Sequence, residues 1–200
     1  IDHEFGRIVA ALRDSGQLDN TIILFHSDHG ELLGDHGLIY KGCRFFEGLV
    51  HVPLIAAWPG RYGAGSLSEA LVELVDIAPT LLDAAGIEVP ENMQGKSLHS
   101  LLCGEADPGH HKDHVISQFY DALAQPDGSH GTMYRDTRYK MAVYHGHNIG
   151  ELYDLQNDPG EFDNLWDDPA SRDLKCKILH RHLDAMMGTV PPGEPRVDRY

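Results

Sequence analysis

The chain contains 200 residues, 42% of them hydrophobic, and its formal net charge at pH 7 is -15. A chain this acidic repels the phosphates of a nucleic-acid backbone, so nucleic acid is excluded as a partner. No run of about 18 apolar residues is present, so we expect no membrane span within these residues.

The first predicted elements are one helix and two strands. Apolar residues recur at helical spacing over residues 1–14, and Gly16 suits the left-handed residue that follows a helix. Apolar, β-branched and aromatic residues over 21–26 then predict a buried strand, and a second apolar run over 52–57 predicts another strand. A helix, a short loop and an apolar strand form half of a βαβ unit, so we expect both strands to belong to one parallel sheet.

The middle of the chain combines loops with one predicted helix. Glycine and proline over residues 59–65 predict a surface loop. A short extended piece then leads into a helix predicted from Ile77 to Ala85, which Gly86 ends. The polar segments 104–113 and 124–131 are predicted to be loops.

The last part of the chain changes to short strands and one closing helix. Asp136-Thr137 suits a hairpin turn, and residues 157–160 suit a tight exit turn. The strands are predicted at residues 114–120, 132–135, 139–144 and 151–155. The closing helix is marked, at a period of about 3.6 residues, by Leu174, Ile178, Leu179, His182, Leu183 and Met186.

A carboxylate and an imidazole follow the predicted strand 21–26 directly. Asp28 and His29 stand side by side in an SDHG motif, and ligands of open α/β sheets gather at the carboxyl ends of strands. The two side chains are therefore well placed to bind one cation. Lys41 comes from the loop that follows, where it can reach an anion held on that cation.

Five ordered segments resemble the C-terminal half of the type I sulfatases, in the alkaline-phosphatase superfamily. A lone SDHG motif is a weak signal, whereas five segments in the right order over nearly the whole chain are a strong one. The segments are Ser27-Asp28-His29-Gly30; Gly34-Asp35-His36-Gly37 with Lys41 and Glu47-Gly48; His51-Val52-Pro53-Leu54-Ile55; Asp76-Ile77-Ala78-Pro79-Thr80-Leu81-Leu82; and Glu151-Leu152-Tyr153-Asp154-Leu155 with Asn157-Asp158-Pro159-Gly160-Glu161.

The resemblance implies that Asp28 and His29 are two protein ligands of one divalent cation, usually calcium in this family. The imidazole leaves magnesium, manganese and zinc open, because calcium prefers oxygen ligands. Calcium takes about six to eight ligands, so the others must come from elsewhere. Lys41 resembles the lysine that contacts the sulfate, where it neutralises charge on the nonbridging oxygens and could help to protonate the leaving oxygen.

His36 is a second catalytic candidate, and two interpretations of it stay open. It either contacts the leaving-group side of the substrate or packs its own loop. Glu31 and Asp35 are interpreted as loop carboxylates outside the ligand set, because like charges around one ion are usually kept from direct contact with it.

The nucleophile implied by the resemblance is absent from this sequence. Sulfatases make formylglycine by oxidising the cysteine of a C-x-[PA]-x-R motif, and neither Cys43 nor Cys103 nor Cys176 stands in one. We expect Cys43 to be a small buried filler. The nucleophile, its arginine and the other metal carboxylates are expected in an N-terminal part of the same enzyme, so the 200 residues alone should not turn over substrate.

Other parts of the resemblance are interpreted as folding signals. Asp76 is expected to cap the helix that follows, with Pro79 in its first turn. The ELYDL and NDPGE motifs are interpreted as a strand and a turn. Five further histidines are expected to be solvated loop residues rather than a metal cluster: His110, His111, His114, His145 and His147.

The resemblance also implies an α/β fold. We expect part of a large, mostly parallel sheet flanked by helices, followed by a small antiparallel sheet with a C-terminal helix. Residues 1–113 would form the C-terminal part of the sulfatase α/β domain, and residues 114–200 a small α+β subdomain. Loops at 110–114 and 118–130 are hypothesised to border the substrate pocket.

The implied function is that of a sulfatase, a sulfuric ester hydrolase, to which this chain contributes metal-binding and sulfate-binding residues. Hydrated formylglycine would attack sulfur, the alcohol would leave protonated, and the sulfated intermediate would release sulfate. The substrate would be a small sulfate ester or a sulfated sugar. Three alternatives stay open: a phosphonate monoester or phosphodiester hydrolase of the same superfamily, a noncatalytic binding relative, and a complete small protein that holds a structural ion.

Overall fold

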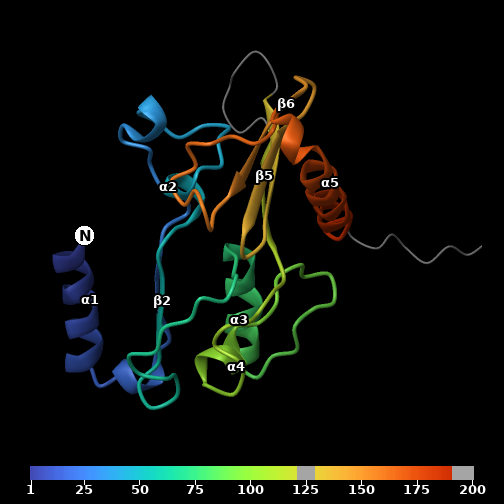
Figure 1. The fold of residues 1–200 in the computed structure, drawn as a ribbon. Coiled ribbons are helices and arrows are strands. Elements are labelled where there is room, and N and C mark those ends of the chain that lie inside the picture. The colour runs from blue at the N-terminus through green and yellow to red at the C-terminus, as the bar shows by residue number, and fades with distance from the viewer. Residues whose placement is uncertain (121–128, 191–200) are drawn as a thin grey trace, which may run out of the picture.

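The computed structural model describes residues 1–120 and 129–190. Two strands and four α-helices make up its N-terminal half (Figure 1). In chain order they are α1 (Asp2–Asp14), β1 (Ile23–His26), α2 (Glu47–Val50), β2 (Leu54–Ala57), α3 (Ile77–Ala84) and α4 (His99–Leu102). None of the helices in these two ranges has the length and apolar character that crossing a membrane requires.

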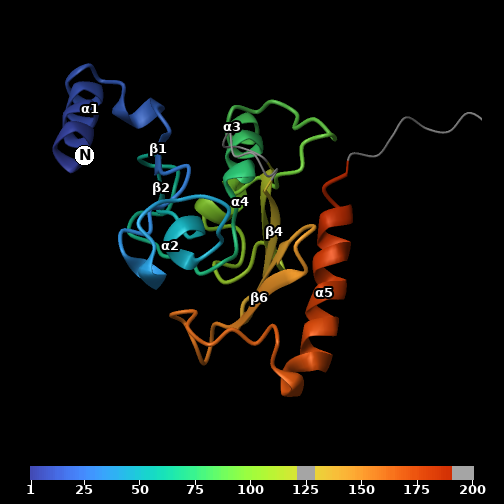
Figure 2. The same cartoon turned by 90° about the horizontal axis from the view of Figure 1, so that it is seen from above.

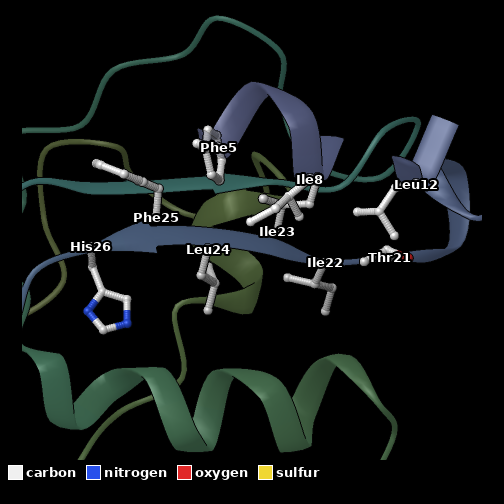
Figure 3. A pocket seen from close by; sticks show the side chains of 9 residues that line it. All are labelled: Phe5, Ile8, Leu12, Thr21, Ile22, Ile23, Leu24, Phe25 and His26. Carbon is white, nitrogen blue, oxygen red and sulfur yellow. The ribbon is translucent and has the colours of Figure 1, made fainter. Parts of the chain in front are cut away.

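The predicted N-terminal helix is confirmed, and it packs along one side of β1. The rings of Phe5 and Phe25 meet edge to face, with their centroids 5.2 Å apart. Figure 3 shows Phe5 and Ile8 of α1 on the side of β1 that carries Ile23 and Phe25. Leu24 points to the opposite side, because successive residues of a strand alternate between its two faces.

β1 and β2 lie side by side but run antiparallel. Ile23 pairs with Ala57, and His26 pairs with Leu54. The expectation that these two strands run parallel is therefore wrong. A parallel pair needs a crossover that returns the chain to the end where it started. Residues 27–53 contain only the short helix α2 and one 3₁₀ turn, so the chain reverses instead.

The C-terminal half is a four-stranded antiparallel sheet with one long helix, as predicted. In spatial order the sheet contains β3 (Val115–Tyr120), β4 (His130–Arg135), β5 (Tyr139–Tyr144) and β6 (Ile149–Asp154), and α5 (Arg172–Met187) follows. The predicted hairpin turn at Asp136 is confirmed. The carboxylate of Asp136 accepts hydrogen bonds from the backbone N–H groups of Arg138 and Tyr139 and so holds β4 and β5 in register.

Both faces of this sheet are covered. One face packs on α5, with the buried residues Tyr134, Met141, Leu152, Ile178 and Ala185. The opposite face packs on the segment that leads into α2, with the buried residues Phe45, Met133, Ala142 and Tyr144. Figure 2 shows α5 along one side of the sheet and α2 on the other. The sheet is therefore apolar on both faces and packs between α5 and the segment that leads into α2.

β4 begins earlier than predicted. The loop expected over 124–131 is wrong at its last two residues, because His130 pairs with Tyr120 and Gly131 continues the ladder. A Cβ at Gly131 would lie 2.8 Å from a ring carbon of Phe45, so only glycine allows this close approach. Residues 124–128 of that prediction lie outside the described residues.

Asp76 does not cap α3 with its side chain, contrary to expectation. Its buried carboxylate instead accepts hydrogen bonds from the backbone N–H of Glu73 at 2.9 Å, that of Lys96 at 2.8 Å and Lys112 Nζ at 2.6 Å. The predicted helix itself is confirmed, with Gly86 in the left-handed region just beyond it. Asp76 thus ties the turn before α3 to segments distant in sequence.

Two of the five histidines expected to be solvated are packed. His111 is 6% exposed, and its Nε2 lies 3.8 Å from Asp76 Oδ2. Burial lowers the pKa of His111, against the opposing effect of the Asp76 carboxylate. His114 stacks on Tyr134, with the ring centroids 5.2 Å apart. The other three, His110, His145 and His147, are exposed.

His182 of α5 is a buried imidazole. It is 2% exposed, and neither Nδ1 nor Nε2 has a partner among residues 1–120 and 129–190. Burial, with a smaller effect of the charge on His145, lowers the pKa of His182 from 6.5 to about 4. The folded chain therefore keeps this ring neutral where an unfolded chain would protonate it.

We expect the free energy of unfolding to fall as the pH falls from 6.5 to about 4, because the unfolded chain binds a proton at His182 in this window and the folded chain does not. The full effect is about 3 kcal/mol. Denaturant titrations of the protein and of His182→Leu, at about pH 7 and about pH 4.5, measure it. The substitution should make stability less dependent on pH; equal pH dependence in both proteins would contradict the assignment.

Candidate functional site

The chain leaves β1 in a tight turn that presents Asp28 and His29. The hydroxyl of Ser27 donates to the carbonyl of His29 at 2.7 Å, and the backbone N–H of His29 donates to Asp28 Oδ1 at 3.0 Å. These local bonds fix the turn without using Asp28 Oδ2. The Asp28 side chain is 84% exposed, so its second oxygen is open to a partner.

The orientation of the His29 ring follows from one hydrogen bond. His29 Nδ1 lies 2.7 Å from the carbonyl oxygen of Gly30. A carbonyl can only accept, so Nδ1 carries the proton and donates it, which leaves a lone pair on Nε2. This nitrogen accepts from Lys41 Nζ at 2.8 Å and lies 3.6 Å from Asp28 Oδ2. Asp28, His29 and Lys41 therefore lie together, and their roles as ligands and sulfate-binding residue stay a prediction.

The surroundings of Asp28 keep its carboxylate charged. The hydrogen bond from the His29 N–H, with a smaller effect of the charge on Lys41, holds the pKa of Asp28 below its ordinary value. An ionised carboxylate beside an imidazole lone pair is a suitable donor pair for a divalent cation. The proton on Nδ1, held by a backbone carbonyl, is the support that metal-binding histidines usually have.

Gly30 brings this turn into direct contact with α2. Its N–H donates to the carbonyl of Leu49 at 2.8 Å. A Cβ on Gly30 would lie only 1.9 Å from the carbonyl oxygen of Gly48, so no other residue fits. The glycine of the SDHG motif is therefore explained by close backbone packing, and the position of α2 determines that of the turn.

His36 lies among aromatic rings. Its ring stacks on Phe46 at a centroid distance of 3.7 Å and an interplanar angle of 10°, and Phe162 is 5.2 Å away. The residue is in the left-handed region, at φ +53°. No hydrogen bond joins His36 to Asp28, His29 or Lys41 in the described chain. The packing interpretation of His36 has contacts to support it, and its catalytic role stays a prediction.

A partly buried group of charges beside this site was not predicted from the sequence. The charge cluster consists of Glu47, Arg135, Lys140 and Glu161. Lys140 Nζ donates to Glu47 Oε1 at 3.0 Å and pairs with Glu161, while Arg135 Nε lies 3.3 Å from Glu47 Oε1. Burial would raise the pKa of Glu47, but the charges of Lys140 and Arg135 lower it. A lysine inside an apolar strand was the available signal, because lysine is rarely buried without a partner.

The two donors fit part of a metal shell. Within the described ranges, no group of three or more His, Cys, Asp or Glu side chains is arranged to hold an ion. Asp28 and His29 supply one carboxylate oxygen and one imidazole nitrogen, whereas calcium takes about six to eight ligands. The pair is therefore compatible with a divalent cation whose other ligands come from elsewhere.

The three cysteines are free thiols. Cys43 is partly buried and packs against the core around Phe45, in agreement with its expected role as a filler. Burial raises the pKa of the Cys43 thiol, which keeps it protonated and unreactive.

The hypothesised pocket border is only partly described. Residues 121–128 lie outside the described residues. Tyr120 stacks on His130, with the ring centroids 4.0 Å apart, at the end of the β3–β4 pair. The role of these loops in substrate binding stays a hypothesis.

Comparison with known proteins identifies the family. The model for the C-terminal region of N-sulphoglucosamine sulphohydrolase matches residues 34–188. An N-acetylglucosamine-6-O-sulfatase of Bacteroides thetaiotaomicron is 37% identical over 169 residues, covering 83% of this chain and 30% of the relative. An arylsulfatase of Clostridium perfringens is 34% identical over 190 residues, covering 92% of this chain and 38% of the relative.

Solved structures share the fold. One, determined in complex with its substrate D-glucosamine-2-N,6-O-disulfate, has a TM-score of 0.84 and 29% identity, over 97% of this chain and 40% of that one. A phosphonate monoester hydrolase of Silicibacter pomeroyi also has a TM-score of 0.84 and 29% identity, over 95% of this chain and 39% of its own. They confirm the α/β fold.

The chain thus spans 30% to 38% of the length of these two curated relatives. The family model begins after the turn that carries Asp28 and His29, and it contains Lys41, α2 and the C-terminal sheet. The chain belongs to the N-sulphoglucosamine sulphohydrolase C-terminal family and corresponds to the C-terminal part of the type I sulfatases.

Proposed function

We propose that the protein containing this chain is a sulfatase, a sulfuric ester hydrolase. The observation that carries the proposal is the convergence of Asp28, His29 and Lys41 at the end of β1. A carboxylate, an oriented imidazole and an ammonium group at one point can together hold a cation and the anionic group of a substrate. The chain's net charge of -15 makes such a local positive site necessary for an anionic substrate.

Asp28 and His29 are proposed to hold one divalent cation, for which calcium is the first candidate. When bound, the cation supplies positive charge for the oxygens of the sulfate. Asp28 contributes an ionised oxygen, and His29 contributes the lone pair of Nε2. The Gly30 carbonyl keeps that lone pair directed away from the backbone.

Lys41 is proposed to bind the sulfate. The lone pair of His29 Nε2 serves one partner at a time, so Lys41 must leave it whenever the imidazole acts as a ligand. Its ammonium group is then available to the nonbridging oxygens of the sulfate, where it offsets negative charge in the transition state. Its flexible stem allows this change of partner.

The nucleophile is proposed to be a formylglycine in another part of the protein. None of the three cysteines here stands in a C-x-[PA]-x-R motif, and Cys43 is packed against a core. The substrate is proposed to be a sulfated sugar. Support comes from the relative named N-acetylglucosamine-6-O-sulfatase and from the neighbour solved with a sulfated glucosamine.

A phosphonate monoester hydrolase is the second candidate, because one such enzyme matches this chain with a TM-score of 0.84. The full-length protein should hydrolyse sulfate esters with a higher kcat/KM than phosphonate or phosphate esters of the same alcohol. Peptide mass spectrometry should find formylglycine in the same preparation. A preference for phosphonate esters would favour the second candidate, and no hydrolysis together with no formylglycine would favour a binding protein.

Substitution of the two proposed ligands should remove ion binding. Asp28→Ala and His29→Ala in the full-length protein should each lower kcat/KM by about a hundredfold to a thousandfold and weaken the binding of calcium measured by calorimetry. Glu31→Gln is the matched control, because Glu31 is a neighbouring carboxylate whose Oε1 accepts from the adjacent N–H of Leu32. Calcium affinity that is the same in all three variants would refute the ligand assignment.

Substitution of Lys41 should separate sulfate binding from ion binding. Lys41→Met should lower kcat/KM by about a hundredfold to a thousandfold. Calcium affinity should stay the same or increase, because the competing donor to His29 Nε2 is gone. Lys177→Met, at an exposed lysine of α5, controls for the loss of one positive charge. A Lys41→Met enzyme with unchanged kinetics would exclude Lys41 from the site.

A further inference from the structure

The charge cluster of Glu47, Arg135, Lys140 and Glu161 has no role in the proposed chemistry, yet it lies against the helix that supports the site. We propose that Lys140 and Glu161 are positioning residues, which orient His29 through α2. This inference deepens the proposed function and rests on it for the role of His29. It assigns the C-terminal sheet a part in building the site.

The cluster joins α2 to the C-terminal sheet by directional contacts. Lys140 is 2% exposed and Glu161 is 3% exposed, and the two form an ion pair. Lys140 also donates to Glu47 Oε1, beside Arg135. Two carboxylates and two cations balance one another, which is the condition under which charges stay buried. Removal of either Lys140 or Glu161 therefore leaves an uncompensated charge next to α2.

Glu161 also holds the first turn of α2. Its Oε2 accepts a hydrogen bond from the backbone N–H of Glu47 at 2.7 Å, across 114 positions of sequence. Phe46, the residue before the helix, makes no capping hydrogen bond with its side chain. Glu161 reaches this position from the left-handed region, at φ +59°, which is unfavourable for a residue with a side chain. Such a conformation persists only where surrounding contacts impose it.

A continuous set of short contacts runs from α2 to the His29 ring. The carbonyl of Leu49 accepts from the N–H of Gly30 at 2.8 Å, and the carbonyl of Gly48 lies where a Cβ of Gly30 would be. The carbonyl of Gly30 in turn accepts from His29 Nδ1 at 2.7 Å. A shift of α2 must therefore move Gly30, and with it the acceptor that orients the imidazole.

Apolar packing alone holds α2 against the sheet less specifically. Phe46 and Leu49 are buried together with Tyr153 of β6. Such contacts are non-directional and tolerate small sliding. Hydrogen bonds and ion pairs to Glu47 fix the position of the helix along and around its axis. Loss of the charges should therefore displace the turn at His29 more than it separates the two halves of the chain.

The test uses the full-length protein with Lys140→Met and, separately, Glu161→Gln. Lys140→Met keeps the length of the side chain, and Glu161→Gln keeps its shape. Ile178→Ala is the matched control, because Ile178 is 1% exposed in the core between the same sheet and α5. Hydrogen exchange followed by mass spectrometry reports on the peptide that contains Gly30, whose N–H is bonded to α2.

Exchange in the Gly30 peptide should rise about tenfold or more in both charge variants, relative to the control, because a buried charge has lost its partner. Calcium affinity should fall by about tenfold to a hundredfold in the same variants and stay unchanged in Ile178→Ala. Equal exchange of the Gly30 peptide in the wild-type protein and both charge variants would overturn the inference. An equal rise of exchange in Ile178→Ala would also overturn it, because any loss of core stability would then have the same effect as loss of the charges.

The two proposals fail in different ways. If the wild-type protein binds no calcium, or if Asp28→Ala binds it as well as the wild type, the ligand assignment fails. The exchange of the Gly30 peptide still decides the inference in that case, because it measures the contact between α2 and the turn without any ion.

Discussion

The close contact between Gly30 and α2 is the constraint on which the site depends. The backbone of α2 lies where a side chain of residue 30 would otherwise be, and the Leu49 carbonyl holds the Gly30 N–H. The turn after β1 therefore has one position relative to the helix. Because the Gly30 carbonyl also accepts from His29 Nδ1, the same glycine places the lone pair of the imidazole on Nε2.

The C-terminal sheet matters to function because it supports α2 from the other side. Its strands alternate between residues that pack on α5 and residues that pack on the segment before α2. Gly131 removes the side chain that would keep Phe45 away. Buried charges add directional contacts to this apolar packing, because Lys140 and Glu161 both bind Glu47 at the start of α2. The sheet carries none of the predicted ligands. It nevertheless holds α2, the helix against which the turn with Asp28 and His29 packs.

Charge is distributed unevenly between the chain and its site. The net charge of -15 is unfavourable for an anionic substrate at long range. At short range, Lys41 and the proposed cation on Asp28 and His29 make the electrostatic potential positive. Screening by salt limits the long-range repulsion to about 8 Å at physiological ionic strength, so the local charges dominate at contact distance. An acidic chain can therefore contribute to an anion site, because the positive charges at the site act at shorter distances than the screened repulsion.

The sequence by itself determined the features that depend on neighbouring residues: the helices of α1, α3 and α5, the hairpin turn at Asp136, and the adjacency of Asp28 and His29. Tertiary structure decided the direction of β2 against β1, the burial of His111, and the cluster that joins Glu47 to Glu161. Periodicity and turn propensity act over a few residues and can be recognised locally. Strand direction and ion pairing between residues 114 positions apart depend on how distant segments pack, which no local pattern records.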